Sequence, residues 1–542
     1  MIVGAGSAGC VLANRLSADP RNRVILLEAG GDDRPFKNLR QFRTNMMIHI
    51  PVGFAEAVAD PRITWDLKTE PEPGANDRIF SVTRAKVLGG CSSINGMLYV
   101  RGEASDYDGW RQLGCTGWGW DDVLPYFRRA ENREHGEDKW HGVGGPLSVT
   151  DAGPVYEVSQ RALEAAAAVG IPILDDPNRG AQYGGARSQA TIAKGRRHSA
   201  AVAYLHPAMK RKNLTVVTNA QATRVLFEGR RAVGVEFVRD GQLQSVRARG
   251  EVVLAGGTIA SPHLLELSGI GGGERLAALN IPLVADSPGV GENLQDHYLT
   301  FVAFQAKPGV RSINTITHGM AMAGQALQYL VNRGGLLSEP PAQLLIYARS
   351  KPGLEAADIQ FSFSPATALD TEPGLRMQTC REPGFTFAPC HLRPASRGWV
   401  HTRSADSRIP PSIQFNYLTD PIDQAAQIAG VRIAREIAAQ PQLAELIETE
   451  IKPGATIQAD AQILDYARRM GNTVYHPVGT VHMGVDERAP LDPRLRVRGV
   501  EGLRVVDASV MPRLVSGNTN APTIMIGEKA SDMILEDARA YA

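Results

Sequence analysis

The first thirty residues carry the pattern that most restricts the fold of this chain. Gly4, Gly6 and Gly9 have the spacing G-x-G-x-x-G, between a short apolar stretch, 1–3, and residues 10–16, which have the composition of a helix. We interpret the segment as strand, tight turn and helix. Gly4 makes the turn, Gly6 leaves room for a ligand phosphate, and Gly9 lets the helix pack on the strand. The N–H groups and positive dipole end of the helix would face that phosphate.

A second strand is predicted over residues 23–27, and it ends in Glu28. An acid about twenty positions beyond the last glycine is where a carboxylate accepts hydrogen bonds from the adenosine ribose of a dinucleotide, and it disfavours the 2′-phosphate of NADP. Glycine-rich turns also occur without ligands, but the four elements together predict a dinucleotide-binding unit. The first strand is shorter than the mean of roughly five or six residues, which leaves open whether residues precede Met1.

Composition excludes several classes of protein. A length of 542 residues suggests about two to four domains. The 58 basic and 57 acidic side chains give a formal net charge of +1, so there is no overall electrostatic signature of binding to nucleic acid or to an anionic membrane.

No apolar run approaches about eighteen residues, and we expect neither a membrane span nor a signal peptide. Five cysteines without a C-x-x-C pair argue against a disulfide framework or a metal site and favour a cytoplasmic location.

Small residues gather at two further places where backbone could lie against a ligand. Gly89 and its neighbour lead through Cys91 to Asn95, although a tight loop without a ligand explains that composition equally well. In residues 251–271 a buried strand again ends on small residues before a helix. The other expected elements are an irregular segment at 31–75, helices at 159–169 and at 195–209 with Ser199 as its cap, a strand at 214–220, a strand pair near 223–238, and a closing helix at 522–538.

Residues 301–465 differ from the rest of the chain. They contain longer loops, more prolines and alternating strands such as 358–364, followed by helices at 422–438 and 460–469. We interpret this block as a second domain that faces the substrate, with helices on one side of a sheet.

The succession of motifs resembles the glucose–methanol–choline oxidoreductases, FAD enzymes that oxidise alcohols. The resemblance covers essentially the whole chain and rests on the N-terminal glycines and on segments 84–102, 257–271, 289–297, 472–484, 503–512 and 517–534. It implies a mixed fold, α/β and α+β. A Rossmann-like FAD-binding domain would comprise residues 1–155, 197–300 and 466–542, and a substrate-binding domain built on a mostly antiparallel sheet would comprise residues 156–196 and 301–465.

The resemblance also assigns site residues. It places Gly4, Gly6, Gly9 and Glu28 at the ADP half of FAD, Gly89 and Asn95 along the flavin, Ala222 against the adenine through its backbone, and Asp507 and Ala508 near the pyrophosphate and ribityl chain.

It further implies a catalytic pair, His476 and Asn518. At the position of Asn518 many relatives have a second histidine. His482 occupies a position where many relatives have arginine, and we interpret it as structural. Ile94 stands where choline oxidases link FAD covalently through a histidine. Isoleucine has no nucleophile, so we expect noncovalent FAD.

The chemistry agrees with this pair. Oxidising an alcohol removes a hydride from carbon, which flavin accepts, and a proton from oxygen, which the protein must accept. His476 suits the proton because an imidazole pKa near 6.5 leaves the ring largely neutral at pH 7. Asn518 cannot take a proton, but its amide can donate to the oxygen as negative charge develops there. Most histidines taken at random are structural, and Asn518 would also suit a turn, so the motif decides both assignments.

The leading hypothesis is FAD-dependent oxidation of a primary or secondary alcohol to an aldehyde or ketone. The alternative is a non-redox flavin-containing lyase or photodecarboxylase of the same fold. An alignment anchored at Arg349 and Ser350 places neutral Gln343 where choline-oxidising relatives often have glutamate, which predicts a small neutral alcohol or a sugar-like substrate. The sequence leaves open which alcohol is oxidised, whether oxygen or another electron acceptor is used, and the oligomeric state.

Overall fold

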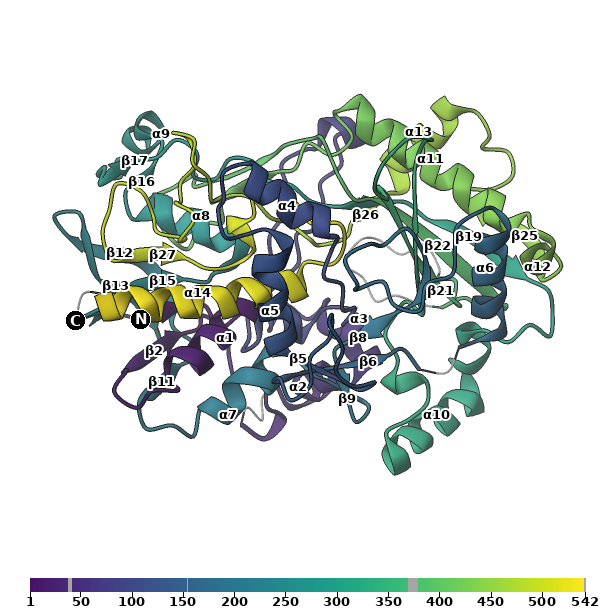
Figure 1. The fold of residues 1–542 in the computed structure, drawn as a ribbon, viewed down its shortest axis with the longest axis horizontal. Helices are drawn as coiled ribbons and strands as arrows, with labels where there is room; N and C mark the ends of the chain where they lie inside the picture. Colours follow the sequence, from purple (N-terminus) through teal and green to yellow (C-terminus); the bar gives the residue numbers. More distant parts are fainter. Residues whose placement is uncertain (38–40, 154, 369–378, 541–542) are drawn as a thin grey trace.

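A computed structural model describes residues 1–37, 41–153, 155–368 and 379–540. Among these residues, five strands form a parallel sheet (Figure 1). The strands are short and rich in Val, Ile and Leu, as expected for a parallel sheet that is covered on both faces. In spatial order they are β11 (Leu214–Val217), β2 (Val24–Leu27), β1 (Ile2–Val3), β15 (Val252–Leu254) and β27 (Leu503–Val505).

Helices follow these strands directly. α1 (Ser7–Leu16) begins four residues after β1 and packs against α14 (Asn520–Ala540), while α8 (Gly257–Leu267) follows β15. Because parallel strands end at the same edge of a sheet, Gly4, Glu28 and Asp507 are brought to one edge. The dinucleotide-binding unit predicted from the first thirty residues therefore forms as strand, turn, helix and second strand.

A second sheet contains eight of the described strands, and all of its pairings are antiparallel. This confirms the predicted mixed fold with a mostly antiparallel second sheet. The main path is β25 (Ile447–Lys452), β19 (Val302–Ala306), β22 (Gly384–His391), β21 (Ile359–Ser364), β20 (Leu344–Ala348) and β7 (Gly184–Arg187). Off this path, β18 (Tyr298–Leu299) pairs with β22, and β26 (Asn472–Thr473) pairs with β18.

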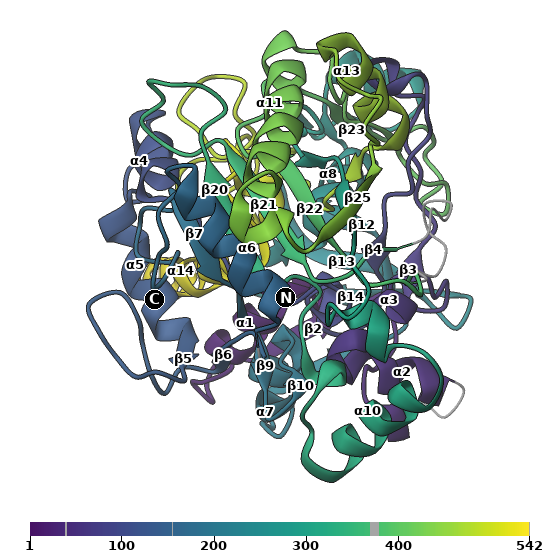
Figure 2. The same cartoon turned by 90° about the vertical axis from the view of Figure 1, so that its right-hand side faces the viewer.

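The two faces of this large sheet differ. α6 (Glu157–Ala168) and α11 (Pro421–Ala438) cover one face, and α13 (Asp460–Met470) lies beside α11 (Figure 2). Side chains alternate between the faces of a strand, so Phe361 and Phe363 pack under the helices while Ser362 and Ser364 point to the opposite face.

Two local predictions were wrong. Residues 31–75 are not irregular throughout, because α2 (Phe42–His49) buries Asn45, Ile48 and His49. The helix predicted over 195–209 begins only at Ala201, because a left-handed Gly195 (φ +68°) closes a hairpin before it. The strand pair did form, as β12 (Gln221–Glu228) and β13 (Arg231–Arg239), with β14 (Gln242–Arg247) added.

The remaining elements are connections and small satellites of the two sheets. In the part of the chain that the structure describes, no helix is long and apolar enough to cross a bilayer. Further helices are α3 (Phe54–Ala57), α4 (Ala104–Gln112), α5 (Trp120–Ala130), α7 (His206–Ala208), α9 (Gly273–Ala278), α10 (Gly319–Asn332) and α12 (Pro441–Ala444), and further strands are β3 (Thr64–Trp65), β4 (Arg84–Ala85), β5 (Glu131–Arg133), β6 (Leu147–Asp151), β8 (Gln189–Ala190), β9 (Ile192–Ala193), β10 (Arg196–Arg197), β16 (Ile270–Gly271), β17 (Ala285–Asp286), β23 (Trp399–His401) and β24 (Ser412–Gln414).

Candidate active site

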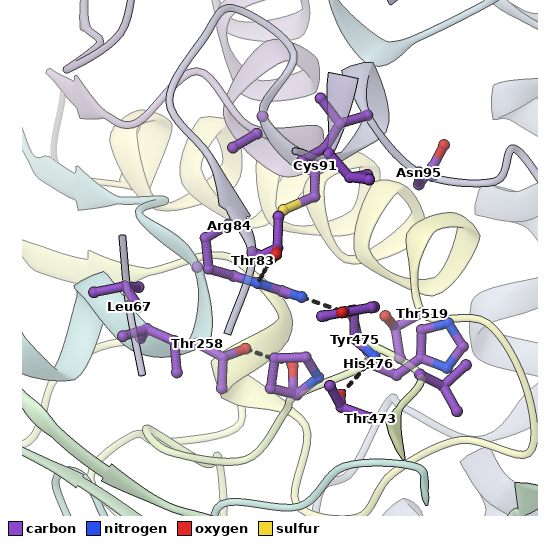
Figure 3. Close-up of a pocket in the computed structure, with 18 of the residues that line it drawn as sticks. Leu67, Thr83, Arg84, Cys91, Asn95, Thr258, Thr473, Tyr475, His476 and Thr519 are labelled. Carbon is purple, nitrogen blue, oxygen red and sulfur yellow. Dashed lines mark hydrogen bonds between the residues drawn. The ribbon is translucent and has the colours of Figure 1, made fainter. Parts of the chain in front are cut away.

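Residues of both sheets line a cavity of about 1270 Å³. Typical small-molecule sites occupy about 300–1000 Å³, so this space is large enough for more than one small ligand. Figure 3 shows part of its wall, with His476, Tyr475 and Thr473 on one side and Cys91 and Asn95 on the other. The predicted residues that line it are Gly4, Gly6, Glu28, Asn95, Ala222, His476, Asp507, Ala508 and Asn518.

The N-terminal glycines have separate roles. Gly4 has a left-handed φ of +100°, and a Cβ there would lie 2.4 Å from the carbonyl oxygen of Ala255, so the turn requires glycine. A Cβ on Gly6 would come no closer than 3.8 Å to Ala255, and Gly6 lines the cavity with bare backbone. Gly9 does not line the cavity. Its Cβ would lie 1.9 Å from the oxygen of Gly4, which confirms its predicted role in helix packing.

Glu28 and Asp507 are buried carboxylates at the same sheet edge, and both hold backbone in place. Glu28 accepts hydrogen bonds from the N–H groups of Ala5 (2.7 Å) and Gly30 (2.8 Å). Asp507 accepts one from Gly257 N–H (2.9 Å) and another from the Ser261 hydroxyl (2.6 Å). Burial raises the pKa of both carboxyl groups. The sequence predicted their place at the cavity but not this bracing of the loops.

The second glycine-rich loop differs in detail from the prediction. Gly89 does not line the cavity, because it faces inward, where a Cβ would lie 2.2 Å from Ser93 Oγ. Its neighbour Gly90 does line the cavity, and a Cβ there would lie 2.6 Å from Gly6 Cα. Gly90 therefore permits close approach of the two glycine loops. Asn95 lines the cavity, and Arg197 Nη1 donates to its Oδ1 at 2.7 Å.

His476 and Asn518 meet in the cavity wall. Asn518 Nδ2 donates to His476 Nε2 at 3.1 Å, although the two residues lie on separate loops, after β26 and before α14. The His476 loop is held by its neighbours. Arg84 Nη2 donates to the carbonyl oxygen of Tyr475 at 3.0 Å (Figure 3), and Tyr475 has a left-handed φ of +63°.

Asp296 fixes the backbone of the same loop. Its Oδ1 accepts the N–H of His476 at 2.7 Å. Its Oδ2 accepts the hydroxyls of Thr473 (2.5 Å) and Tyr417 (2.6 Å). Burial raises the pKa of Asp296, and these hydrogen bonds oppose that shift. A single buried carboxylate thus positions the His476 loop.

The hydrogen bonds of His297 set the tautomer of His476. His297 Nε2 lies 3.2 Å from the carbonyl oxygen of Leu392, which can only accept, so Nε2 carries a hydrogen. In the neutral ring His297 Nδ1 is then an acceptor, and His476 Nδ1, at 3.0 Å, must donate to it. His476 Nε2 is left with its lone pair, next to Asn518 and the cavity.

Burial keeps both rings neutral. It lowers the pKa of His476 well below the ordinary value, and the nearby His297 and Arg84 lower it further. Burial also lowers the pKa of His297 to about 3. Both rings are therefore unprotonated at neutral pH.

Sequence reasoning missed His297 and Asp296, although both lie in the motif segment 289–297. Their roles depend on contacts with residues 179 and 180 positions away. The adjacent acid and histidine in that motif were the available signal. His482 does not line the cavity.

Gln343 is a correction. It does not line the cavity, and its side chain is buried, accepting from Ser159 Oγ at 2.8 Å and donating to Glu339 at 3.0 Å. Its neighbour Ala342 does line the cavity. Adjacent residues point in opposite directions near a strand, so an alignment error of one residue suffices to misplace the side chain.

The large sheet supplies the cavity wall opposite its helices. Ser364 pairs with Thr386, which pairs with Ala303, and Ser362 pairs with Ala388. All five line the cavity. We call this set the small-residue wall, because its side chains leave space and offer hydroxyls.

Comparison with known proteins places this site in a family. Models of the GMC oxidoreductases match residues 1–299 and 394–527. The chain belongs to the GMC oxidoreductase family. It is 41% identical to mitochondrial choline dehydrogenase of Mus musculus (98% of this chain, 89% of the relative), and 40% identical to alcohol dehydrogenase [acceptor] of Pseudomonas putida (99% and 95%).

Solved structures agree. Pyridoxine 4-oxidase from Mesorbium loti has a TM-score of 0.86 at 30% identity and covers 98% of each chain. An FAD-dependent oxidoreductase from Chaetomium thermophilum has a TM-score of 0.88 at 27% identity and covers 99% of each chain. As a GMC oxidoreductase, the protein is an FAD-dependent dehydrogenase or oxidase that acts on CH–OH donors, which confirms the predicted family and enzyme class.

The cavity fits FAD. Bare backbone at Gly6 and at Gly257, which has nothing within 4 Å of a Cβ position, lies beside the starts of α1 and α8. Backbone of this kind accommodates a pyrophosphate. Beside His476, Asn518 Oδ1 is a buried polar atom without a partner among the described residues, as expected where a ligand binds.

Proposed function

We propose that this GMC oxidoreductase oxidises a neutral primary or secondary alcohol to an aldehyde or ketone, with His476 as the base and with FAD held noncovalently. The observation that carries the assignment is the lone pair on His476 Nε2, which the hydrogen bonds of His297 leave facing Asn518 and the cavity. FAD supplies the hydride acceptor when bound.

The residues then divide the work on the hydroxyl group. His476 Nε2 accepts the hydroxyl proton, since its low pKa keeps the ring unprotonated at neutral pH. In the structure Asn518 donates one amide hydrogen to the lone pair of His476 Nε2, so the substrate hydroxyl must displace that hydrogen bond before its proton is transferred. The other amide hydrogen is available to the substrate oxygen, where it stabilises the developing negative charge. Asp296 keeps His476 in place during the transfer.

The preference for a neutral alcohol rests on the charges of the cavity rather than on Gln343. Among the cavity-lining residues that the structure describes, the carboxylates are Glu28, Asp66 and Asp507. None of them lies on the large sheet, and Glu28 and Asp507 are engaged by backbone N–H groups. The small-residue wall thus offers hydroxyls but no anion. Choline, which appears in the names of several relatives, carries a quaternary ammonium that an anion would stabilise best.

A matched pair of substrates tests this proposal. Choline and its neutral carbon isostere 3,3-dimethylbutan-1-ol have nearly the same shape, so their comparison isolates the charge. In anaerobic mixing we expect both to bleach the oxidised-flavin absorption, with the neutral alcohol at least as efficient. A choline advantage of about tenfold or more, roughly 1.4 kcal/mol, would refute the neutral preference. A wide alcohol panel that gives no bleaching would instead support the lyase or photodecarboxylase alternative.

Noncovalent FAD follows from Ile94, which lines the cavity and has no nucleophilic atom. Acid or heat precipitation should release all of the yellow chromophore into the supernatant as FAD. Flavin that stays with the precipitated chain would show a covalent link, for which Cys91, also in the cavity wall, would be the first residue to replace. Parallel assays with oxygen and with a dye acceptor would establish which electron acceptor the enzyme uses.

A further inference from the structure

α10 projects from the lower edge of the molecule in Figures 1 and 2. Of its fourteen residues, all of which the structure describes, only Tyr329 is buried. Large apolar side chains point outward instead. Met320 is 90% exposed, Leu327 63%, Leu330 71% and Val331 77%. A soluble protein rarely leaves such a contiguous apolar surface without a partner.

The helix itself also carries no negative charge. Residues 319–332 contain no charged side chain, and the longer stretch 306–338 contains only cations, Lys307, Arg311 and Arg333. The hairpin of β9 and β10 adds exposed Lys194 and Arg196. This hairpin lies against α10, because the hydroxyl of Tyr329 donates to the carbonyl oxygen of Gly195 at 3.0 Å. Arg333, Lys194 and Arg196 therefore place positive charge beside the C-terminal part of the apolar helix.

An anionic lipid surface fits this combination. Fourteen residues span about 21 Å, which is shorter than the roughly 30 Å core of a bilayer, so the helix would lie in the interface rather than cross it. Apolar side chains would enter the boundary between headgroups and acyl chains, and the bordering cations would attract anionic headgroups. A second copy of the chain fits less well, because a two-fold contact would bring two like-charged borders together.

We propose that α10 docks this protein on the surface of an anionic bilayer. The cations of this surface are local, which agrees with an overall charge near zero. Pro341 and Ala342, a short way beyond α10 in the chain, line the active-site cavity.

Flotation of the FAD-loaded full chain tests the proposal. One set of vesicles contains phosphatidylcholine with about 30% phosphatidylglycerol, and the other contains phosphatidylcholine alone. The test variant combines Leu327→Glu and Leu330→Glu. The matched control is Ile422→Glu, since Ile422 is 62% exposed on α11, away from α10. Flavin content, melting temperature and dye reduction in solution should be unchanged in both variants.

We expect the wild type and the Ile422→Glu control to float with the anionic vesicles and the α10 variant to bind at least about tenfold less. Salt at about 0.5 M, or replacement of Arg196 and Arg333 by glutamine, should weaken binding to the anionic vesicles by several-fold. The proposal is wrong if the wild type does not float, or if the α10 variant floats equally well. A wild-type dimer that the α10 substitutions dissociate, without vesicle binding, would identify the surface as an interface between copies.

Discussion

The two sheets meet at the same cavity but present different chemistry to it. The parallel sheet offers backbone at Gly4, Gly6 and Gly257, where side chains would clash or fill the space. The antiparallel sheet offers side chains such as Ser362 and Thr386, which can change without altering the strand. A surface made of backbone restricts the sequence to glycine and is therefore recognisable. A surface made of side chains can vary with the substrate.

The largest expected effect separates two glycines of the backbone edge. Gly4→Ala should lower the free energy of unfolding by about 3 kcal/mol or more, because the new Cβ would meet the Ala255 carbonyl in a left-handed turn. Gly6→Ala has space for its Cβ and should leave the apoprotein nearly as stable. It should still weaken FAD binding by at least about tenfold, since the methyl enters the cavity.

Denaturant unfolding of the FAD-free proteins and flavin titration measure the two quantities separately. The separate roles of the two glycines, Gly4 in the turn and Gly6 at the ligand, would be contradicted if Gly6→Ala unfolds as readily as Gly4→Ala. They would also be contradicted if Gly6→Ala binds FAD like the wild type.

A substitution of His297 tests whether a buried side chain outside the cavity controls the tautomer of His476 and, through it, the rate of proton transfer. His297→Phe fills the ring volume but removes the acceptor for His476 Nδ1–H, so His476 is free to adopt the other tautomer. The flavin reduction rate should fall about 10- to 100-fold with FAD still bound. His482→Phe is the matched control, a half-buried histidine outside the cavity, and should keep the rate. Equal rates in wild type and His297→Phe would contradict the role of the pair.

Stability should depend on pH through histidines that partial or full burial keeps neutral, and His263 is half-buried. Burial lowers the pKa of His263, on the parallel-sheet side, to about 4. A lowered folded-state pKa means that the unfolded chain binds the proton first. The contribution of His263 is thus complete above about pH 6.5 and is lost as pH falls toward 4.

Between pH 7 and pH 5 this loss should be about 2 kcal/mol for His263 alone. Urea unfolding at both pH values, for wild type and His263→Gln, measures it. The variant should show the smaller pH dependence, and an identical dependence in the two proteins would show that His263 is not buried in its neutral form.

The small-residue wall should respond to an added charge with a change of substrate. Ser362→Glu would place an anion in the cavity, and the ratio of kcat/KM for choline to that for 3,3-dimethylbutan-1-ol should rise by about tenfold. Ser362→Gln, of similar volume but neutral, should leave the ratio unchanged. The same rise in both variants would mean that shape rather than charge controls the choice.

These two kinds of surface also explain how far sequence reasoning reached. Gly4, Gly6 and Glu28 were found because the ligand-facing turn permits few alternatives. His476 and Asn518 were found through motifs, and the structure brings them within 3.1 Å.

The errors have a common cause. Gly89 and Gly90 are neighbours with the same composition, and only their backbone geometry determines which one faces the cavity. Gln343 was misplaced because strand alternation turns it away from the side that Ala342 faces. The role of His297 depends on a contact across 179 positions, which no local pattern contains.

The rate of anaerobic flavin reduction per bound FAD, measured against pH for wild type, His476→Ala and Asn518→Ala, tests the central claim most directly. If His476 is the base, His476→Ala keeps its FAD but is reduced about 10²- to 10⁴-fold more slowly, roughly 3–5 kcal/mol of barrier. The wild-type rate should fall on acidification only well below pH 6.5, because burial lowers the pKa of His476. Asn518→Ala should be slower but keep that acid limb. A His476→Ala enzyme that keeps both its rate and its acid limb would contradict the account.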